Sequence, residues 1–166
     1  DRYAGIYQSE LAATEANLTV LLNGRDTPAK LMSESLQTRL LDALVACPNG
    51  VMRMSDAIPG VTETSTNLGV IKTLEGEVYV QCLIRSLIDS GRESVEQMTR
   101  SLFSLAGASC EFTGAYPGWA PNVDSPVMAL VRSSYQTLFG EMPNVMVIHA
   151  GLECGLVKSA YPDWDM

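Results

Sequence analysis

Residues 77–87 alternate in character, and this alternation constrains the fold more than any other feature of the chain. One face of the implied strand is apolar, and the opposite face is mixed: Val78, Val80, Cys82 and Ile84 against Tyr79, Gln81, Leu83 and Arg85. Residues 67–73 form a second extended run, and Glu75-Gly76 lies between the two runs. The pattern therefore predicts an antiparallel hairpin.

A helix and another strand are expected after this hairpin. Ser90 and Glu93 have the spacing of a capping box that opens a helix. The stripe expected to be buried on this helix comprises Val95, Met98, Leu102 and Leu105. Residues 110–116 predict a further strand. The order strand, strand, helix, strand is that of the later part of a ferredoxin-like α+β sandwich.

Two amphipathic helices and a short strand are expected before the hairpin. The first helix would end at Asn23-Gly24, and one face of it carries Tyr7, Leu11, Leu18 and Leu22. Thr27 can cap the second helix, with Pro28 at its first position. Its apolar stripe comprises Met32, Leu36, Leu40 and Leu44. Residues 47–50 predict a turn, and residues 51–54 predict the short strand.

Residues 116–121 (Tyr-Pro-Gly-Trp-Ala-Pro) predict a domain boundary. After it, Asp124 or Ser125 can cap a helix that runs from Pro126 to about Phe139, where Gly140 ends it. A strand at 145–148, a glycine turn and a helix should follow. The predicted class is α/β: a ferredoxin-like α+β sandwich over residues 1–120, then a helix-strand-helix piece of a larger α/β domain over 121–166. The later strand needs partners from elsewhere, so we expect both chain ends to be cuts.

Composition excludes several classes of partner. The formal net charge is -8, from 11 basic and 19 acidic residues, which argues against nucleic acid and anionic membranes. Apolar runs stay below the length of about 18 residues that a membrane span needs. The four cysteines form no Cys-x-x-Cys pair, so a zinc finger is not expected. We interpret them as free thiols in a reducing cytoplasm.

Reactive side chains are concentrated in residues 147–155. His149, Glu153 and Cys154 lie there beside Gly151 and Gly155. Glu153 fits a ligand contact, a general base or a first-turn helix acid. The glycines fit either close approach of a substrate to the backbone or simple turn geometry. His149 with Cys154 suggests a nucleophile pair, although a solitary histidine at a strand end is more often a hydrogen-bonded structural group.

Arg85 is the candidate residue for binding an anionic group, because it lies at the end of a strand. A guanidinium there can hold a carboxylate through two parallel hydrogen bonds, which lysine cannot do as well. The alternative is a surface arginine paired with Asp89 or a neighbouring glutamate. Spacing alone leaves both interpretations open.

Six stretches taken together resemble the bacterial aminoacyl-histidine dipeptidases, also called cytosolic β-alanyl-histidine dipeptidases, of the di-zinc peptidase family. In chain order these stretches are residues 48–51, 63–70, 82–91, 114–119, 124–128 and 148–156. The resemblance implies a catalytic α/β domain interrupted by a lid domain that also mediates homodimerisation. Residues 1–120 would then be the second half of the lid, and residues 121–166 part of the catalytic domain.

The resemblance also implies a function. Such enzymes hydrolyse Xaa-His dipeptides in the cytoplasm with a zinc-activated water, and two zinc ions occupy each active site. Arg85 would hold the carboxylate of the dipeptide substrate, and Gly151 to Glu153 would line the substrate pocket.

The family's metal ligands and catalytic carboxylate fall outside the matched stretches. The resemblance therefore assigns no catalytic residue and no zinc ligand to this chain, which should be inactive alone. The competing hypotheses are a stand-alone, non-catalytic ferredoxin-like binding or dimerisation module and a cysteine-dependent hydrolase.

Overall fold

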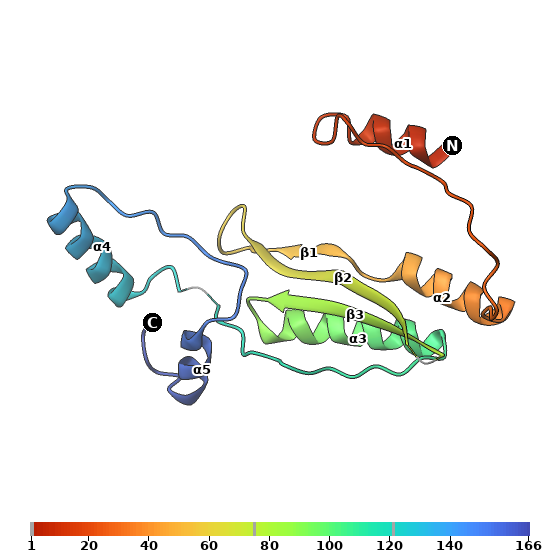
Figure 1. Cartoon of the computed structure of the whole chain (residues 1–166). Coiled ribbons are helices and arrows are strands. Elements are labelled where there is room, and N and C mark those ends of the chain that lie inside the picture. Colours follow the sequence, from red (N-terminus) through yellow and green to blue (C-terminus); the bar gives the residue numbers. More distant parts are fainter. Residues whose placement is uncertain (1, 75, 121) are drawn as a thin grey trace. The chain divides into compact units, whose positions relative to one another are not determined.

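A computed structural model describes residues 2–74, 76–120 and 122–166 of the chain. Figure 1 shows its elements in order: α1 (Arg2–Glu10), α2 (Glu34–Ala46), β1 (Gly50–Met54), β2 (Thr62–Leu74), β3 (Glu77–Ser86), α3 (Asp89–Leu105), α4 (Pro126–Phe139) and α5 (Glu153–Ala160). The chain divides into two compact units, residues 1–33 and residues 34–166. None of the described helices is long and apolar enough to cross a membrane.

The first unit contains a shorter helix than the sequence predicts. Helix α1 ends at Glu10, a turn follows, and the remaining described residues up to 33 are irregular. No side chain among residues 2–33 is buried, and Leu22 is fully exposed. A helix that buries no apolar face lacks the packing that usually stabilises it. The prediction of one helix reaching Asn23-Gly24 was therefore wrong.

The second unit contains the predicted hairpin, within a three-stranded antiparallel sheet of order β1-β2-β3. Strand β2 begins five residues earlier than predicted, and β1 occupies the predicted short strand. The register between β2 and β3 shifts between Leu68 and Val70, so Gly69 is an extra residue on β2. Glu75, in the predicted turn, lies outside the described residues. The mixed α/β class is confirmed.

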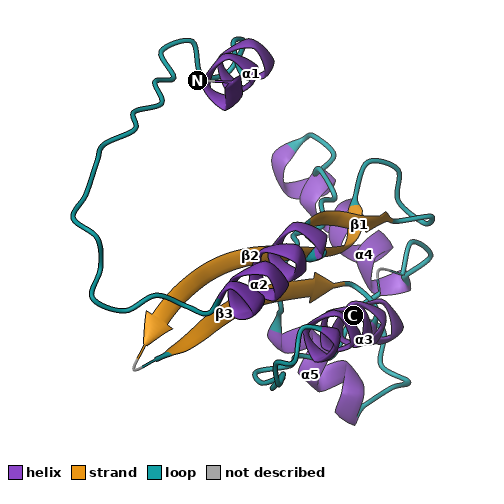
Figure 2. Ribbon diagram, turned by 90° about the vertical axis from the view of Figure 1, so that its right-hand side faces the viewer, coloured by secondary structure: helices purple, strands orange, loops and turns teal. Residues whose placement is uncertain are grey.

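One face of the sheet packs against helices α2 and α3 (Figure 2). The inward residues of β3 are the predicted ones: Val78, Val80, Cys82 and Ile84 are partly buried, whereas Tyr79, Gln81, Leu83 and Arg85 are exposed. Ala43 and Cys47 of the α2 end form the core cluster with Phe103 of α3. The helices therefore leave the opposite face of the sheet uncovered.

Helix α3 differs from its prediction at two points. It begins at Asp89 after Ile88, with no side-chain cap, so Ser90 lies inside the helix and the capping box was wrong. Its buried residues are Val95, Thr99 and Phe103, whereas Met98 and Leu105 are exposed. These three buried residues are spaced by four positions, so they lie on the side of α3 that faces the sheet, and threonine is small enough to fit there.

Helix α2 also differs from its prediction. It begins at Glu34 instead of Pro28, which corrects the second predicted helix.

Two predicted strands do not form. Residues 110–116 and 145–148 are irregular and join no ladder with the described strands. An extended segment becomes a strand only by hydrogen bonding to a neighbour, and neither segment has one among the described residues.

Helix α4 follows its prediction closely. The Ser125 hydroxyl accepts a hydrogen bond from the Met128 amide at 3.0 Å, and Pro126 takes the first helical position. Gly140 ends the helix in the left-handed region, at φ 78°. The Asp165 carboxylate adds a second cap, because it accepts from Ser125 Oγ at 2.9 Å and from the Val127 amide at 2.8 Å.

Candidate functional site

The hairpin places Arg85 on the face of the sheet that α2 and α3 do not cover. We call this the open face and define it by the exposed residues of β3: Tyr79, Gln81, Leu83 and Arg85. Arg85 is paired with Ser65 of β2 in the antiparallel ladder. Directly opposed residues project from the same face of a sheet, so the side chains of Ser65 and Arg85 leave the sheet on the same side.

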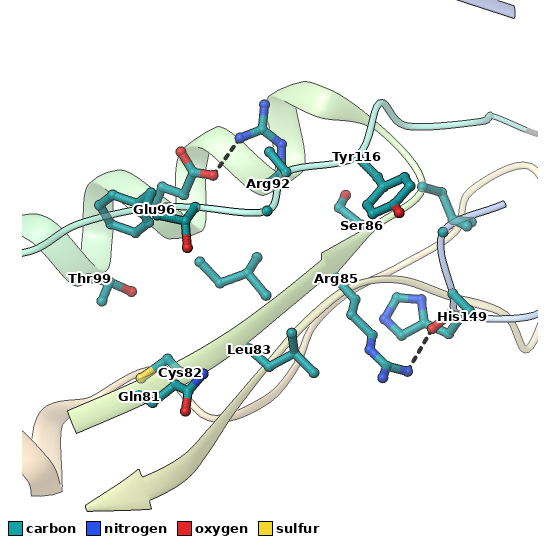
Figure 3. Close-up of a pocket in the computed structure, with 18 of the residues that line it drawn as sticks. Gln81, Cys82, Leu83, Arg85, Ser86, Arg92, Glu96, Thr99, Tyr116 and His149 are labelled. Atoms are coloured by element: carbon teal, nitrogen blue, oxygen red, sulfur yellow. Dashed lines mark hydrogen bonds and ion pairs between the residues drawn. The ribbon is translucent and has the colours of Figure 1, made fainter. Parts of the chain in front are cut away.

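His149 contacts both of these side chains. Its ring Nε2 lies 2.6 Å from Ser65 Oγ. Its carbonyl oxygen accepts a hydrogen bond of 2.9 Å from Arg85 Nη1, which Figure 3 shows as a dashed line. Burial, and secondarily the charge of Arg85, lower the pKa of His149 below its ordinary value of 6.5. The imidazole is therefore neutral at pH 7, as a hydrogen-bonded structural histidine should be.

Arg85 forms no ion pair among the described residues. The predicted alternative, a pair with Asp89, is wrong: Asp89 Oδ1 accepts from the Gly118 amide at 3.0 Å and lies 3.9 Å from Arg92 Nε. Arg92 also pairs with Glu96 (Figure 3). The carboxylates near the start of α3 thus interact with Arg92 and Gly118. Arg85, at the end of β3, has no carboxylate partner among the described residues.

An open cavity of ≈1670 Å³ borders Arg85. Tyr116, His149 and Gly151 also line it. Gly151 lies against the Tyr116 ring, because a β-carbon at position 151 would stand 3.2 Å from the ring Cγ. Glycine at position 151 therefore lets the loop approach the tyrosine ring, which would have to shift by a few tenths of an ångström to accept a β-carbon.

Glu153 lies apart from this group. It is the exposed first residue of α5 and does not border the cavity. An acid in the first turn is favoured by the helix dipole. Gly155 is a buried helical residue, not a turn glycine, and a β-carbon there would stand 3.0 Å from the Pro117 carbonyl oxygen. Of the predicted substrate-binding residues, the structure thus brings Arg85 and Gly151 to one cavity and leaves Glu153 outside it.

The nucleophile pair has no geometric support. The Nε2 atom of His149 is engaged by Ser65, and Cys154 lies on α5 with no hydrogen bond to the histidine among the described residues. Within the same part of the chain, no three His, Cys, Asp or Glu residues are grouped so that they could hold a metal ion.

All four cysteines are free thiols. The sulfur atoms of Cys47 and Cys82 lie 3.9 Å apart in the core. Burial and the neighbouring Cys82 raise the pKa of Cys47 to about 11, and burial also raises the pKa of Cys110. These two thiols remain protonated at neutral pH and act as small core residues.

Sequence reasoning missed Ser65. Its place opposite Arg85 depends on the bulge at Gly69, which changes the pairing by one residue. A hairpin without the bulge, closed by Leu74 and Glu77, would pair Thr66 with Arg85. The glycine inside the β2 pattern is the sequence signal that could have indicated the shift.

Comparisons with known proteins show what the chain as a whole is similar to. The chain is 52% identical over 165 residues to the cytosol non-specific dipeptidase of Escherichia coli (strain K12). The match covers 99% of the chain and 34% of that relative. The chain thus spans about one third of the length of that relative. The resemblance seen in the sequence is confirmed, although no protein-family model matches the chain.

A solved dipeptidase structure gives the same result. The crystal structure of aminoacylhistidine dipeptidase from Vibrio alginolyticus matches with a TM-score of 0.92 and 53% sequence identity. It too is covered over 34% of its length, against 99% of this chain. The fold described above is thus a portion of the dipeptidase fold, and both relatives are peptidases by name.

Proposed function

We propose that this chain is part of a zinc-dependent dipeptidase that hydrolyses Xaa-His dipeptides such as β-alanyl-histidine. Residues 1–120 would form part of its lid and residues 121–166 part of its catalytic domain. The observation that carries the proposal is the exposed guanidinium of Arg85, which borders a cavity and pairs with no carboxylate among the described residues. A dipeptide supplies the missing anion, because its C-terminus is a carboxylate.

The geometry supports binding of that carboxylate through two hydrogen bonds from Arg85. The His149 carbonyl engages Nη1 of Arg85, which restrains the long side chain while other N–H groups of the guanidinium remain able to donate. A planar guanidinium matches a carboxylate with two parallel hydrogen bonds. We propose that Gly151 lets the substrate approach the backbone and that Glu153 contributes a contact from the start of α5.

The two zinc ions would be held by other parts of the enzyme. The described residues offer no cluster of ligands for a metal, so we assign no metal-dependent step to them. The role proposed for this chain is to bind and orient the substrate, and we expect it to be inactive by itself.

The proposal includes a homodimer formed through the lid and a cytoplasmic location. All five residues of β1 are exposed, and β1 is an edge strand of the sheet. An unpaired edge is a ready surface for association with a second copy. The Escherichia coli relative is named a cytosol enzyme, and free thiols suit a reducing compartment.

The test is an assay of the full-length protein that carries this chain. Dipeptides with and without C-terminal histidine would be compared, before and after chelation and after zinc is restored. Preferential cleavage of Xaa-His dipeptides that is lost on chelation and regained with zinc supports the proposal. No peptidase activity in the zinc-loaded full-length protein would contradict it.

A further inference from the structure

Three residues from three segments form one hydrogen-bonded group on the open face. Ser65 of β2 and Arg85 of β3 are ladder partners. His149 contacts the serine through its ring and the arginine through its carbonyl oxygen, at 2.6 and 2.9 Å. The histidine therefore connects the two strands to residues 143–150, which follow α4.

Ser65 is the side chain that fixes the histidine ring. It is half-buried, as is His149, and no other described residue forms a hydrogen bond with the ring nitrogens. The distance is short, and both partners can serve as donor or acceptor. Removal of the hydroxyl would leave a half-buried ring nitrogen without its protein partner.

The arginine depends on the histidine in turn. Arg85 is exposed, and its side chain has several freely rotating bonds. Within the described residues its guanidinium is hydrogen-bonded through Nη1 to the His149 carbonyl. A carbonyl held in place therefore selects one orientation of the guanidinium before any substrate binds. Pre-organisation of this kind strengthens binding because less freedom is lost in the complex.

We propose that Ser65 and His149 are positioning residues that orient Arg85 for the carboxylate of the dipeptide. This inference rests on the proposed function, since it assumes that Arg85 receives the carboxylate. The serine fixes the imidazole, the imidazole fixes the backbone at position 149, and that backbone carbonyl holds the guanidinium toward the cavity.

The inference predicts a selective defect. Without the Ser65 hydroxyl, Arg85 keeps its charge but loses its fixed orientation. Recognition of a free carboxylate weakens, whereas steps that do not involve the carboxylate are unaffected. We expect Ser65→Ala to raise KM for β-alanyl-histidine about 3- to 10-fold with little change in kcat.

The experiment is a double-mutant cycle in the full-length enzyme. Ser65→Ala, Arg85→Ala and the double variant are assayed on β-alanyl-histidine and on its C-terminal amide, which lacks the carboxylate. The preference for the acid over the amide is the readout. Ser65→Ala should reduce it partly, Arg85→Ala should abolish it, and the double variant should be no worse than Arg85→Ala alone.

Matched variants separate positioning from general damage. Ser65→Thr keeps the hydroxyl and should restore the preference. His149→Phe removes the ring nitrogen and should reproduce the Ser65→Ala defect, which provides a second test if Ser65→Ala folds poorly. Thr73→Ala removes an exposed hydroxyl elsewhere on β2 and should leave the preference unchanged.

The outcomes distinguish this inference from the proposed function. If Arg85→Ala leaves the preference intact, the carboxylate-binding role proposed for Arg85 fails and the inference fails with it, whereas the dipeptidase activity itself is tested by the assay described above. If Arg85→Ala abolishes the preference while Ser65→Ala and His149→Phe behave like Thr73→Ala, the proposed function stands and the positioning role is refuted. The positioning role would also be refuted if Ser65→Ala changed the kinetics as much in the Arg85→Ala variant as in the enzyme that retains Arg85.

Discussion

Gly118 lies directly against the backbone of Leu87. A β-carbon at position 118 would stand 2.6 Å from the Leu87 carbonyl oxygen and 2.9 Å from the Cα of Ile88. The Gly118 amide also donates to Asp89 Oδ1 at 3.0 Å. The segment around Gly118, where the sequence predicts a domain boundary, thus contacts the connection between β3 and α3, next to the end of the strand that carries Arg85.

Gly118→Ala should destabilise the fold. The added methyl group would meet backbone atoms, which cannot rotate away as a side chain can, and such overpacking costs about 1–3 kcal/mol. Chemical denaturation would measure the loss in free energy of unfolding. Gly24→Ala is the matched control, because nothing lies within 4 Å of a β-carbon at that position. Equal stability of the two variants would contradict the close approach.

Asp165 should contribute stability that depends on pH. Hydrogen bonds from the Val127 amide and Ser125 hydroxyl lower the pKa of Asp165 below its ordinary value of 3.8. The stabilisation by the Asp165 carboxylate is therefore present above pH 3.8. It is lost as the pH falls through the lower pKa that Asp165 has in the folded state. Asp165→Ala should reduce the melting temperature at pH 7 and flatten its decline in acid. Asp163→Ala, which removes an exposed neighbouring acid, should do neither.

His149 should titrate below 6.5, since burial and then Arg85 lower its pKa. Folding favours the neutral ring, so the free energy of unfolding should fall as the pH drops below 6.5 and the unfolded chain takes up the proton first. The chain has one histidine, and its imidazole signal in a nuclear magnetic resonance titration is the one that His149→Phe removes. Arg85→Ala should bring the pKa closer to 6.5. A histidine that titrates above 6.5 would refute the arrangement.

Cys47 should react slowly with alkylating reagents. The thiol is buried, and its pKa is raised to about 11, so little thiolate is present below that pH. Peptide mapping by mass spectrometry after timed alkylation at pH 8 gives the rate for each cysteine. Half-buried Cys154 is the comparison within the same molecule. If Cys47 were labelled as fast as Cys154, the reagent would have access to the core cluster, which would contradict the burial of the thiol.

Local signals were sufficient for some elements. Ser125, Pro126 and Gly140 each specify one position of α4 by their own chemistry, and the structure uses all three as predicted. The alternation along β3 likewise identified the face that carries Arg85. Such features depend on a residue and its nearest neighbours, so they are visible in a sequence.

Features that depend on distant partners were not predicted. The extended runs at 110–116 and 145–148 have strand composition, but a strand also needs a neighbour, and none pairs with them in the described chain. Ser65 reaches Arg85 only because Gly69 shifts the register. The contact between His149 and both strands joins residues 64 and 84 positions apart, and no local pattern encodes it.

The most direct test of the central claim is the preference of the full-length enzyme for a free carboxylate. The ratio of kcat/KM for β-alanyl-histidine to that for its C-terminal amide would be measured before and after Arg85→Ala. Loss of a charge-assisted contact of about 1.5–3 kcal/mol predicts a decrease of roughly 10- to 100-fold for the acid. The amide should be little affected. An equal decrease for both substrates, or none for either, would contradict the role of Arg85 as the group that holds the substrate carboxylate.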